Sequence, residues 1–558
     1  MRRIARGERP HRRRSLVDRV LGLPAPTAQH ISIREDVAVP MRDGVVLRAD
    51  HYVPNGDEHA PVVLVRSPYG RKGMWSRMFG RPFAARGYQV VFQSCRGTGG
   101  SGGALNPLDE REDGLDTVAW LREQPWYPGR FATFGASYMG LAEWALADAG
   151  GSEHAAMAAI VTSSRLARAM FAGGAMNTQV WLEWSATVAA QRARGHSVRE
   201  LVRSQILGRR RIMRALRHLP LGTADGVATG DTLPWWQTWM AHPDPDDAYW
   251  QSLDHAANVP HVGAPVLMVT GWYDPFLPWQ LADWTELDHH DAAHRLVIGP
   301  WMHMDPAGIA TTMRETVAWF DAHLSGRPGR RRAGPVHYHM GGADEWRDAP
   351  TWPPPGVTDQ RWFLHAGGGL SSLTPDPAAP SRYHHDPGDP TPQLGGPAGL
   401  GRPRVRQDAV EARSDVLTFT TAPLAGHLDV VGPVTATVYL RSSVGYTDVV
   451  VRLCDVDATG HSTNLCDGIT RVVPDAISAD RDGVAAVTVD LWPTAHRFGS
   501  GHRLRLQVAG AAYPRFARNP GTGEPLATAT RLVATDHEVF HDPAHPSHVL
   551  LPVATRPS

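Results

Sequence analysis

Residues 129–150, GRFATFGASYMGLAEWALADAG, join a short apolar run to a segment with helical spacing through a serine flanked by glycines. GRFATFGAS predicts a buried strand, and YMGLAEWALADAG predicts the helix that follows it. A strand that turns sharply into a helix at a serine is the nucleophile elbow, usually written G-x-S-x-G. Here the second glycine, Gly140, comes one residue late. Ser137 is therefore either a nucleophile on a slightly different turn or an ordinary helix N-cap.

Three features of this turn favour the nucleophile. Gly135 and Ala136 are small, as the crowded backbone of a tight strand-to-helix turn requires. The N-terminal N–H groups of the following helix favour developing negative charge. Gly140 would let that helix approach the sheet closely, which is the role of the earlier glycine in the usual pattern. The displaced glycine therefore weakens the match without excluding it.

The surrounding sequence continues the alternation of strands and helices. Two alternating runs flank Asp43-Gly44 and predict a hairpin. Strands that alternate with helices predict a mainly parallel α/β sheet. The other segments with this pattern are the strand-plus-loop units at 60–70, 86–103, 264–276 and 294–306, and the helices at 112–126 and 311–326.

Composition separates two further regions from the α/β pattern. Residues 165–250 are rich in tryptophan and methionine and lack strand-like apolar runs, which predicts an inserted helical cap. After residue 335, short alternating strands between Pro- and Gly-rich turns predict a β-sandwich of the jelly-roll type. The predicted organisation is a flexible basic tail (1–30), an α/β-hydrolase domain (31–164 and 251–328), the cap (165–250) and the jelly roll (335–558).

The totals exclude several classes of protein. Of the 558 residues, 42% are hydrophobic, and Lys+Arg and Asp+Glu balance at 56 each, so no net charge favours nucleic acid or an anionic membrane. No run of about eighteen apolar residues predicts a membrane span, and the Arg-rich first residues lack the apolar region of a secretory signal. With only three cysteines, we expect a cytoplasmic protein. Cys454 and Cys466 could be neighbours on a hairpin, but we expect no disulfide.

A serine nucleophile needs a base and a group that orients the base. In α/β-hydrolases these follow in the order serine, acid, histidine, each on a loop after a strand. Asp274 directly follows the predicted strand VLMVTGWY, and His303 directly follows LVIGPWM. Taken singly, Asp274 is equally a turn residue before Pro275, and most of the 28 histidines should be structural or exposed. Their order and places favour a triad of Ser137, Asp274 and His303.

Acyl transfer also needs donors for an oxyanion. The backbone N–H of Tyr138 is the natural first donor, because it follows the nucleophile. Tyr69 ends the early unit VRSPYG, and its hydroxyl could be the second donor, although such a tyrosine more often serves packing. CRGTGGSGG lacks the lysine of a phosphate loop, which predicts a flexible turn near the site. Neither CxxC nor HExxH occurs, so we expect no metal and no cofactor.

The motifs VRSPYG, CRGTGGSGG, GRFATFGASYMG, HPDPDDAYW, GWYDPF and GPWMH together resemble the CocE/NonD family of serine hydrolases, over residues 33–555. The form G-x-S-Y-x-G is the most specific of them. The resemblance implies Ser137 as nucleophile, Asp274 as acid and His303 as base, with the Tyr69 hydroxyl and Tyr138 N–H as the oxyanion hole. It also implies a C-terminal domain similar to that of the X-prolyl dipeptidyl-peptidases. The chain departs from the family at QSCRG, where an aspartate is frequent.

The predicted activity is hydrolysis of a small ester or amide through an acyl-enzyme, without nucleic-acid or membrane partners. The alternatives are an X-Pro dipeptidyl-peptidase-like peptidase or amidase and, less favoured, a non-catalytic ligand-binding protein. Residues 165–221 contain eleven arginines against two acids, Glu183 and Glu200. Because recognition of a free ammonium group needs carboxylates, this composition argues against an aminopeptidase. The oligomeric state cannot be read from the sequence.

Overall fold

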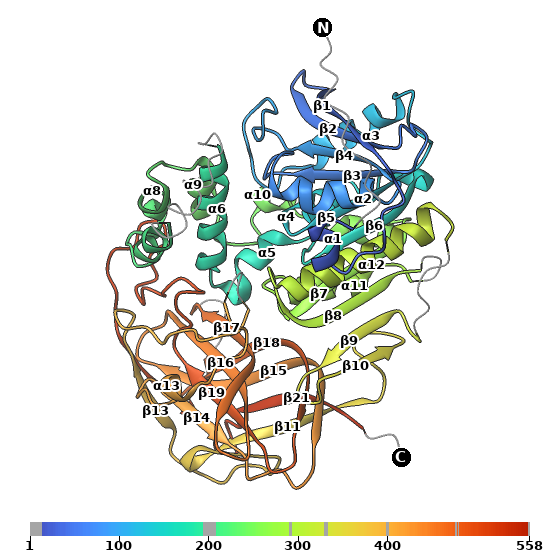
Figure 1. Cartoon of the computed structure of the whole chain (residues 1–558). Coiled ribbons are helices and arrows are strands. Elements are labelled where there is room, and N and C mark those ends of the chain that lie inside the picture. The colour runs from blue at the N-terminus through green and yellow to red at the C-terminus, as the bar shows by residue number, and fades with distance from the viewer. Residues whose placement is uncertain are drawn as a thin grey trace. The chain divides into compact units, whose positions relative to one another are not determined.

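The chain forms two compact units in a computed structural model (Figure 1). The structure describes residues 14–192, 208–289, 293–327, 333–397, 401–474, 477 and 479–555. The first unit comprises Met1–Ala167, Ala248–Gly271 and Phe276–His337, and the second comprises Arg168–Asp247, Trp272–Pro275 and Tyr338–Ser558.

The first unit is built on a sheet whose strands lie in the order β1-β2-β4-β3-β5-β6-β7-β8. β2 is antiparallel to β1 and to β4, which confirms the predicted hairpin at Asp43-Gly44. The pairs β3–β4, β3–β5, β5–β6 and β6–β7 are parallel, so their carboxyl ends share one edge of the sheet. The strands are β1 (Ile31–Pro40), β2 (Val46–Pro54), β3 (Val62–Ser67), β4 (Gln89–Ser94), β5 (Phe131–Ala136), β6 (His154–Ile160), β7 (Val266–Tyr273) and β8 (Arg295–Met302).

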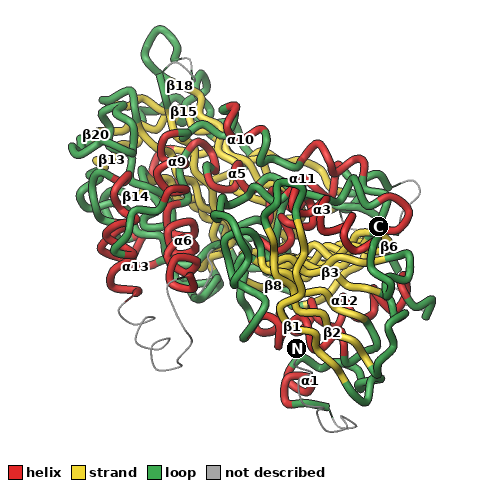
Figure 2. Tube along the Cα trace, turned by 90° about the horizontal axis from the view of Figure 1, so that it is seen from above, coloured by secondary structure: helices red, strands yellow, loops and turns green. Residues whose placement is uncertain are grey.

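Helices cover this sheet, and Figure 2 shows the strands of the unit with helices beside them. One apolar cluster includes Phe92, Phe134 and Phe320, and another includes Val62 and Leu121. Strands buried on both faces therefore read as continuous apolar runs. The helical segments are α1 (Leu16–Val20), η1 (Ser76–Gly80), α2 (Arg81–Ala84), α3 (Arg111–Arg122), α4 (Tyr138–Trp144), η2 (Gly151–Glu153), α10 (Ala248–Gln251), η5 (Ala256–His261), α11 (Leu277–Glu286) and α12 (Pro306–Leu324); α5 (Leu166–Met170) crosses into the second unit.

The prediction that residues 1–30 form a flexible tail is wrong for Leu16–Val20, which form the helix α1. Ser15 caps α1, because its side chain accepts a hydrogen bond from the Asp18 N–H. The Asp18 carboxylate is buried against Arg86, with 2.8 Å between oxygen and nitrogen. This ion pair fixes α1 to the unit, whereas residues 1–13 lie outside the described residues.

The second unit joins helices to the C-terminal strands. The helical segments are η3 (Ala172–Gly174), α6 (Thr178–Arg192), η4 (Leu221–Thr223), α8 (Ala224–Thr229), α9 (Pro234–Ala241) and the later η6 (Ala366–Gly368) and α13 (Asp408–Glu411). The N–H of Ala517 donates to the Met176 carbonyl at 2.9 Å, and that of Leu221 donates to the Leu526 carbonyl at 3.2 Å. The segment predicted as a cap is therefore hydrogen-bonded to loops of the β domain.

In the β domain, β18 begins with alternating buried and exposed residues, whereas every residue of β16 is buried. The strands of the domain's sheet lie in the order β13-β20-β15-β21-β11-β12-β14-β19-β16-β17, with β18 on β15. Cys466 faces Leu453 on the β16–β17 hairpin, and both Cys454 and Cys466 are free thiols. The strands of this sheet are β11 (Val357–His365), β12 (Gly369–Ser371), β13 (Ser381–His385), β14 (Val416–Thr420), β15 (Leu428–Ser442), β16 (Thr447–Val456), β17 (Ser462–Val472), β18 (Ala485–Phe498), β19 (Arg503–Ala509), β20 (Thr535–Phe540) and β21 (His548–Ala554). Two further strands, β9 (Val336–Met340) and β10 (Glu345–Ala349), lie outside this sheet.

No helix among the described residues is both long and apolar enough to cross a membrane.

Candidate active site

Ser137 lies alone between the end of β5 and the start of α4. Its φ is 60° and its ψ is −126°, a conformation that costs a non-glycine residue about 1–3 kcal/mol. Its N–H donates to the Ile160 carbonyl at 2.9 Å, and its carbonyl accepts from the Gly140 N–H at 2.9 Å. The Ser137 side chain makes no capping hydrogen bond. The helix-cap interpretation is therefore wrong, and the strained strand–turn–helix of an elbow is present.

The two glycines of the elbow are required by close contacts. A Cβ on Gly135 would lie 2.2 Å from the Met139 carbonyl oxygen. A Cβ on Gly140 would lie 2.4 Å from Cγ2 of Thr162, in the loop after β6. Gly135 thus allows the turn to close, and Gly140 allows α4 to approach the sheet. Both predicted steric roles are confirmed, so the late glycine still allows the close packing that a strand–turn–helix of this kind needs.

His303 follows β8 directly and reaches the elbow. Its Nε2 lies 2.9 Å from Oγ of Ser137, a hydrogen-bond distance. Its ring meets that of Phe276 edge-on, with 5.3 Å between centroids. The end of β8 packs closely against β7, because a Cβ on Gly271 of β7 would lie 2.3 Å from the Trp301 carbonyl oxygen of β8. The imidazole is therefore placed to exchange a proton with the serine hydroxyl.

Asp274 directly follows β7 and is fully buried, with none of its surface exposed. In the sheet, β7 lies between β6 and β8. The chain order Ser137, Asp274, His303 thus corresponds to the ends of β5, β7 and β8.

Tyr69 lies in the turn after β3, the strand that pairs with β5. Its ring stacks on Trp75, with 5.1 Å between centroids and 28° between planes. Trp75 stacks on Phe79, and the ring centroids of Phe79 and Phe134 of β5 are 4.9 Å apart. A continuous series of rings therefore connects the Tyr69 turn to the strand that leads into the elbow.

The glycine-rich segment CRGTGGSGG is a packed loop, so the predicted flexible turn is wrong. The Gly97 N–H donates to the Gly102 carbonyl at 2.9 Å, and the Arg71 guanidinium donates to the Gly99 carbonyl. A Cβ on Gly99 would lie 2.9 Å from Cα of Gly70. The glycines thus let this loop pack against the turn that carries Tyr69.

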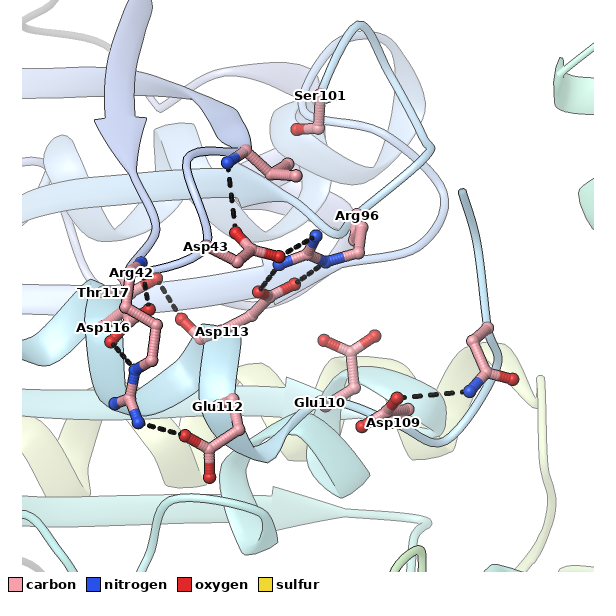
Figure 3. Close-up of polar contacts among 12 residues, drawn as sticks. Arg42, Asp43, Arg96, Ser101, Asp109, Glu110, Glu112, Asp113, Asp116 and Thr117 are labelled. Carbon is pink, nitrogen blue, oxygen red and sulfur yellow. Dashed lines mark hydrogen bonds and ion pairs between the residues drawn. The ribbon is translucent and has the colours of Figure 1, made fainter. Parts of the chain in front are cut away.

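Arg96 ties the same loop to helix α3. Its guanidinium donates to both carboxylate oxygens of Asp113, at 3.0 and 2.5 Å, and to Asp43 at 2.8 Å. Figure 3 shows this group at the first turn of α3, with Glu110 just before the helix.

Sequence reasoning missed Glu110, which lies against Tyr138, the residue that follows Ser137. The Tyr138 hydroxyl donates to Oε1 of Glu110 at 3.0 Å, and Arg66 pairs with Oε2 at 2.8 Å. Burial raises the pKa of Glu110, although Arg66 acts to lower it. Burial also raises the pKa of Tyr138 well above its usual range, so the phenol remains a donor. The only sequence signal was the tyrosine itself in G-x-S-Y-x-G.

No group of three or more His, Cys, Asp or Glu side chains suited to a metal ion occurs among the described residues. Cys95 is buried, and burial raises the pKa of its thiol well above the usual range. A buried thiol of this kind is inert as a nucleophile.

Two family models match the chain. Residues 43–305 match the X-Pro dipeptidyl-peptidase (S15 family), and residues 331–550 match the X-Pro dipeptidyl-peptidase C-terminal non-catalytic domain. The chain is also 33% identical over 580 residues to cocaine esterase of Rhodococcus sp. (strain MB1 Bresler), covering 94% of this chain and 99% of the relative.

Solved structures share the fold. An alpha-amino acid ester hydrolase labelled with selenomethionine matches with a TM-score of 0.78 at 24% identity, covering 94% of this chain and 96% of that one. A CocE/NonD family hydrolase from Staphylococcus aureus matches with a TM-score of 0.70 at 16% identity, covering 94% of each chain. The predicted fold class, an α/β-hydrolase with a cap and a C-terminal jelly roll, is confirmed.

Proposed function

Because the chain belongs to the CocE/NonD family of serine hydrolases, we propose that it cleaves an ester of a small molecule with Ser137 as nucleophile and His303 as base. The observation that carries this proposal is the 2.9 Å separation of Ser137 Oγ and His303 Nε2 at a strained elbow. Family membership by itself gives the coarser statement, a serine hydrolase acting on esters or peptides.

In the first half of the reaction, Oγ of Ser137 attacks the carbonyl carbon while Nε2 of His303 takes the hydroxyl proton. The carbonyl oxygen becomes an oxyanion, which accepts hydrogen bonds from the Tyr138 N–H and the Tyr69 hydroxyl. Collapse of the tetrahedral intermediate breaks the ester bond. His303 returns the proton to the departing alcohol, and the acyl group stays on Ser137.

In the second half, water attacks the acyl-enzyme while His303 again accepts a proton. The carboxylic acid leaves, and Ser137 recovers its hydrogen from His303. We assign Asp274 the orienting carboxylate, which keeps the imidazole in the required tautomer. Its burial and its place after β7, beside β8 in the sheet, support this role.

A peptidase or amidase is the second candidate, favoured by the matches to the two X-Pro dipeptidyl-peptidase models. Both activities would use the same elbow, so the acyl and leaving groups decide between them. Turnover of an acyl ester of a chromogenic phenol, compared with an X-Pro anilide at equal concentration, separates the two. We expect faster hydrolysis of the ester.

The proposal is tested with Ser137→Ala. We expect loss of ester turnover by roughly 10⁴-fold or more, with no labelling by a fluorophosphonate probe and unchanged circular dichroism. Ser252→Ala removes an exposed serine hydroxyl and serves as the matched control, expected to keep both turnover and labelling. Undiminished activity in folded Ser137→Ala would refute the assignment.

A further inference from the structure

Tyr138 supplies only its backbone N–H to the reaction proposed above, yet its side chain is buried and hydrogen-bonded twice. Only 2% of the residue is exposed. Its hydroxyl donates to Oε1 of Glu110 at 3.0 Å and accepts from the Leu108 N–H at 2.7 Å. The first residue of α4 is thereby attached to the loop that precedes α3.

Glu110 is itself fixed by a buried cation. Nη2 of Arg66 lies 2.8 Å from Oε2 of Glu110, and Nη1 donates to the Glu110 carbonyl at 2.8 Å. The remaining Nε of Arg66 donates to Gln93 at 3.0 Å. The Arg66 and Glu110 side chains are both 2% exposed, so water does not compete for these bonds. In Figure 3, Glu110 stands apart from the Arg96, Asp43 and Asp113 group that holds the first turn of α3.

These contacts join two strands to the first residue of α4. Arg66 belongs to β3 and Gln93 to β4, while Tyr138 follows β5 by way of Ser137. Glu110 is therefore a fixed point to which the residue after the nucleophile is hydrogen-bonded.

The elbow needs such a fixed point. The conformation of Ser137, with φ at 60°, persists only when its surroundings over-determine it. The carbonyl of the Ser137–Tyr138 peptide is held by the Gly140 N–H at 2.9 Å. The same peptide carries the Tyr138 N–H, and the hydroxyl of Tyr138 restrains its other side. The direction of that N–H thus depends on both attachments.

We propose that Glu110 is a positioning residue that, through the Tyr138 hydroxyl, sets the direction of the Tyr138 N–H toward the oxyanion. This inference rests on the proposed function, because it assigns that N–H to the oxyanion hole. Any residue other than proline at this position would supply the backbone N–H, so the proposal explains why the side chain in G-x-S-Y-x-G is a tyrosine.

Tyr138→Phe removes the hydroxyl and keeps the ring. We expect kcat for an aryl ester to fall about tenfold with KM unchanged, because a misdirected donor loses part of the roughly 10²–10³-fold that one oxyanion donor supplies. An arylboronic acid, whose serine adduct is tetrahedral, should bind more weakly by a similar factor. If the Tyr138 hydroxyl had only a structural role, Tyr138→Phe would lower the melting temperature without lowering both kcat and the affinity for the arylboronic acid.

Tyr88→Phe is the matched control. The Tyr88 hydroxyl also donates to a carboxylate, that of the partly exposed Asp321, at 2.6 Å. Tyr88 lies just before the amino end of β4, at the opposite edge of the sheet from Ser137. We expect this variant to lose stability and keep kcat. The proposal is overturned if Tyr138→Phe keeps kcat within twofold of the wild type, or loses no more than Tyr88→Phe.

Glu110→Gln gives the second measurement, because the amide oxygen can still accept from the Tyr138 hydroxyl. A smaller loss of kcat than in Tyr138→Phe supports the proposal. If kcat falls in Glu110→Gln but not in Tyr138→Phe, the proposal is overturned, because the effect of Glu110 would not pass through the Tyr138 hydroxyl. A wild-type chain that is neither labelled nor active on esters refutes the proposed function, and this inference with it. An active, labelled chain with an unaffected Tyr138→Phe refutes this inference alone.

Discussion

Tyr69 is the residue that allows the second oxyanion donor to be tested without disturbing the fold. Tyr69→Phe keeps the ring that stacks on Trp75 at 5.1 Å and removes only the hydroxyl. We expect kcat to fall roughly 10²–10³-fold, as for loss of one oxyanion donor, with an unchanged melting temperature. Steady-state ester hydrolysis provides the measurement.

The control for Tyr69→Phe is Tyr127→Phe. Tyr127 lies before β5, and the substitution removes a hydroxyl that donates to Glu153 at 3.1 Å. It should leave kcat unchanged. Equal kcat in Tyr69→Phe and the wild type would contradict the predicted role of Tyr69 as an oxyanion donor and would favour a packing role.

Local motifs explain which site residues were predictable from the sequence. Ser137 was identified from its own turn, and His303 from its place after an apolar run. The 2.9 Å contact shows that Ser137 and His303 meet, while the catalytic roles of Ser137, His303, Asp274, Tyr69 and Tyr138 stay predictions. Glu110 was not predictable, because its pairing with Arg66 joins residues 44 positions apart and follows no local pattern. Sequence spacing identifies groups at strand ends, but not the buried pairs that support them.

At the scale of elements, the elbow depends on the contact between β5 and α4. Gly135→Ala would place its Cβ 2.2 Å from the Met139 carbonyl oxygen, so the backbone of the turn must shift. We expect a lower melting temperature, by an overpacking strain of about 1–3 kcal/mol, and a large loss of kcat, since Ser137 would move. Thermal unfolding and ester kinetics on the same preparation measure both effects.

Gly263→Ala is the control for that substitution, because a Cβ there meets nothing within 4 Å and the residue has no positive φ. It should change neither property. If Gly135→Ala behaved like Gly263→Ala, the close contact would not be what forms the elbow.

The elements that the sequence missed lack the residue types that mark them. β6, HAAMAAI, pairs with β5 and β7 at the centre of the sheet but holds one β-branched residue, Ile160. Alanine and methionine favour helices as single residues, and burial between neighbouring strands overrides that preference here. α1 was missed for another reason, because its five residues depend on the Ser15 cap and on the ion pair to Arg86. By contrast, β3, β4, β5, β7 and β8 were recognisable as continuous apolar runs.

At the scale of the whole molecule, composition predicted separate regions but not which of them associate. The segment Arg168–Asp247 belongs to the same compact unit as the C-terminal strands. Two backbone hydrogen bonds show the association, from Ala517 to Met176 and from Leu221 to Leu526. Partners more than 300 residues apart leave no compositional trace, so this grouping needed the structure.

Buried histidines distributed over both units predict acid sensitivity. Burial lowers the pKa of His51, His154 and His255 to about 4, and that of His537 to about 3. The folded chain keeps these imidazoles neutral, whereas the unfolded chain binds protons below about pH 6.5. Stability therefore falls as the pH drops below 6.5, and the fall continues until the folded pKa is reached.

His154→Gln isolates one of these contributions. The imidazole bonds to Thr133 at 3.0 Å, and a glutamine amide can replace that bond without titrating. Each such histidine contributes a slope of about 1.4 kcal/mol per pH unit, so urea unfolding between pH 6.5 and 5 should show a shallower loss in this variant than in the wild type. His59→Asn removes an exposed histidine and should leave the slope unchanged. Equal slopes in His154→Gln and the wild type would mean that His154 takes up its proton within the folded chain, and acid sensitivity would then have to arise elsewhere.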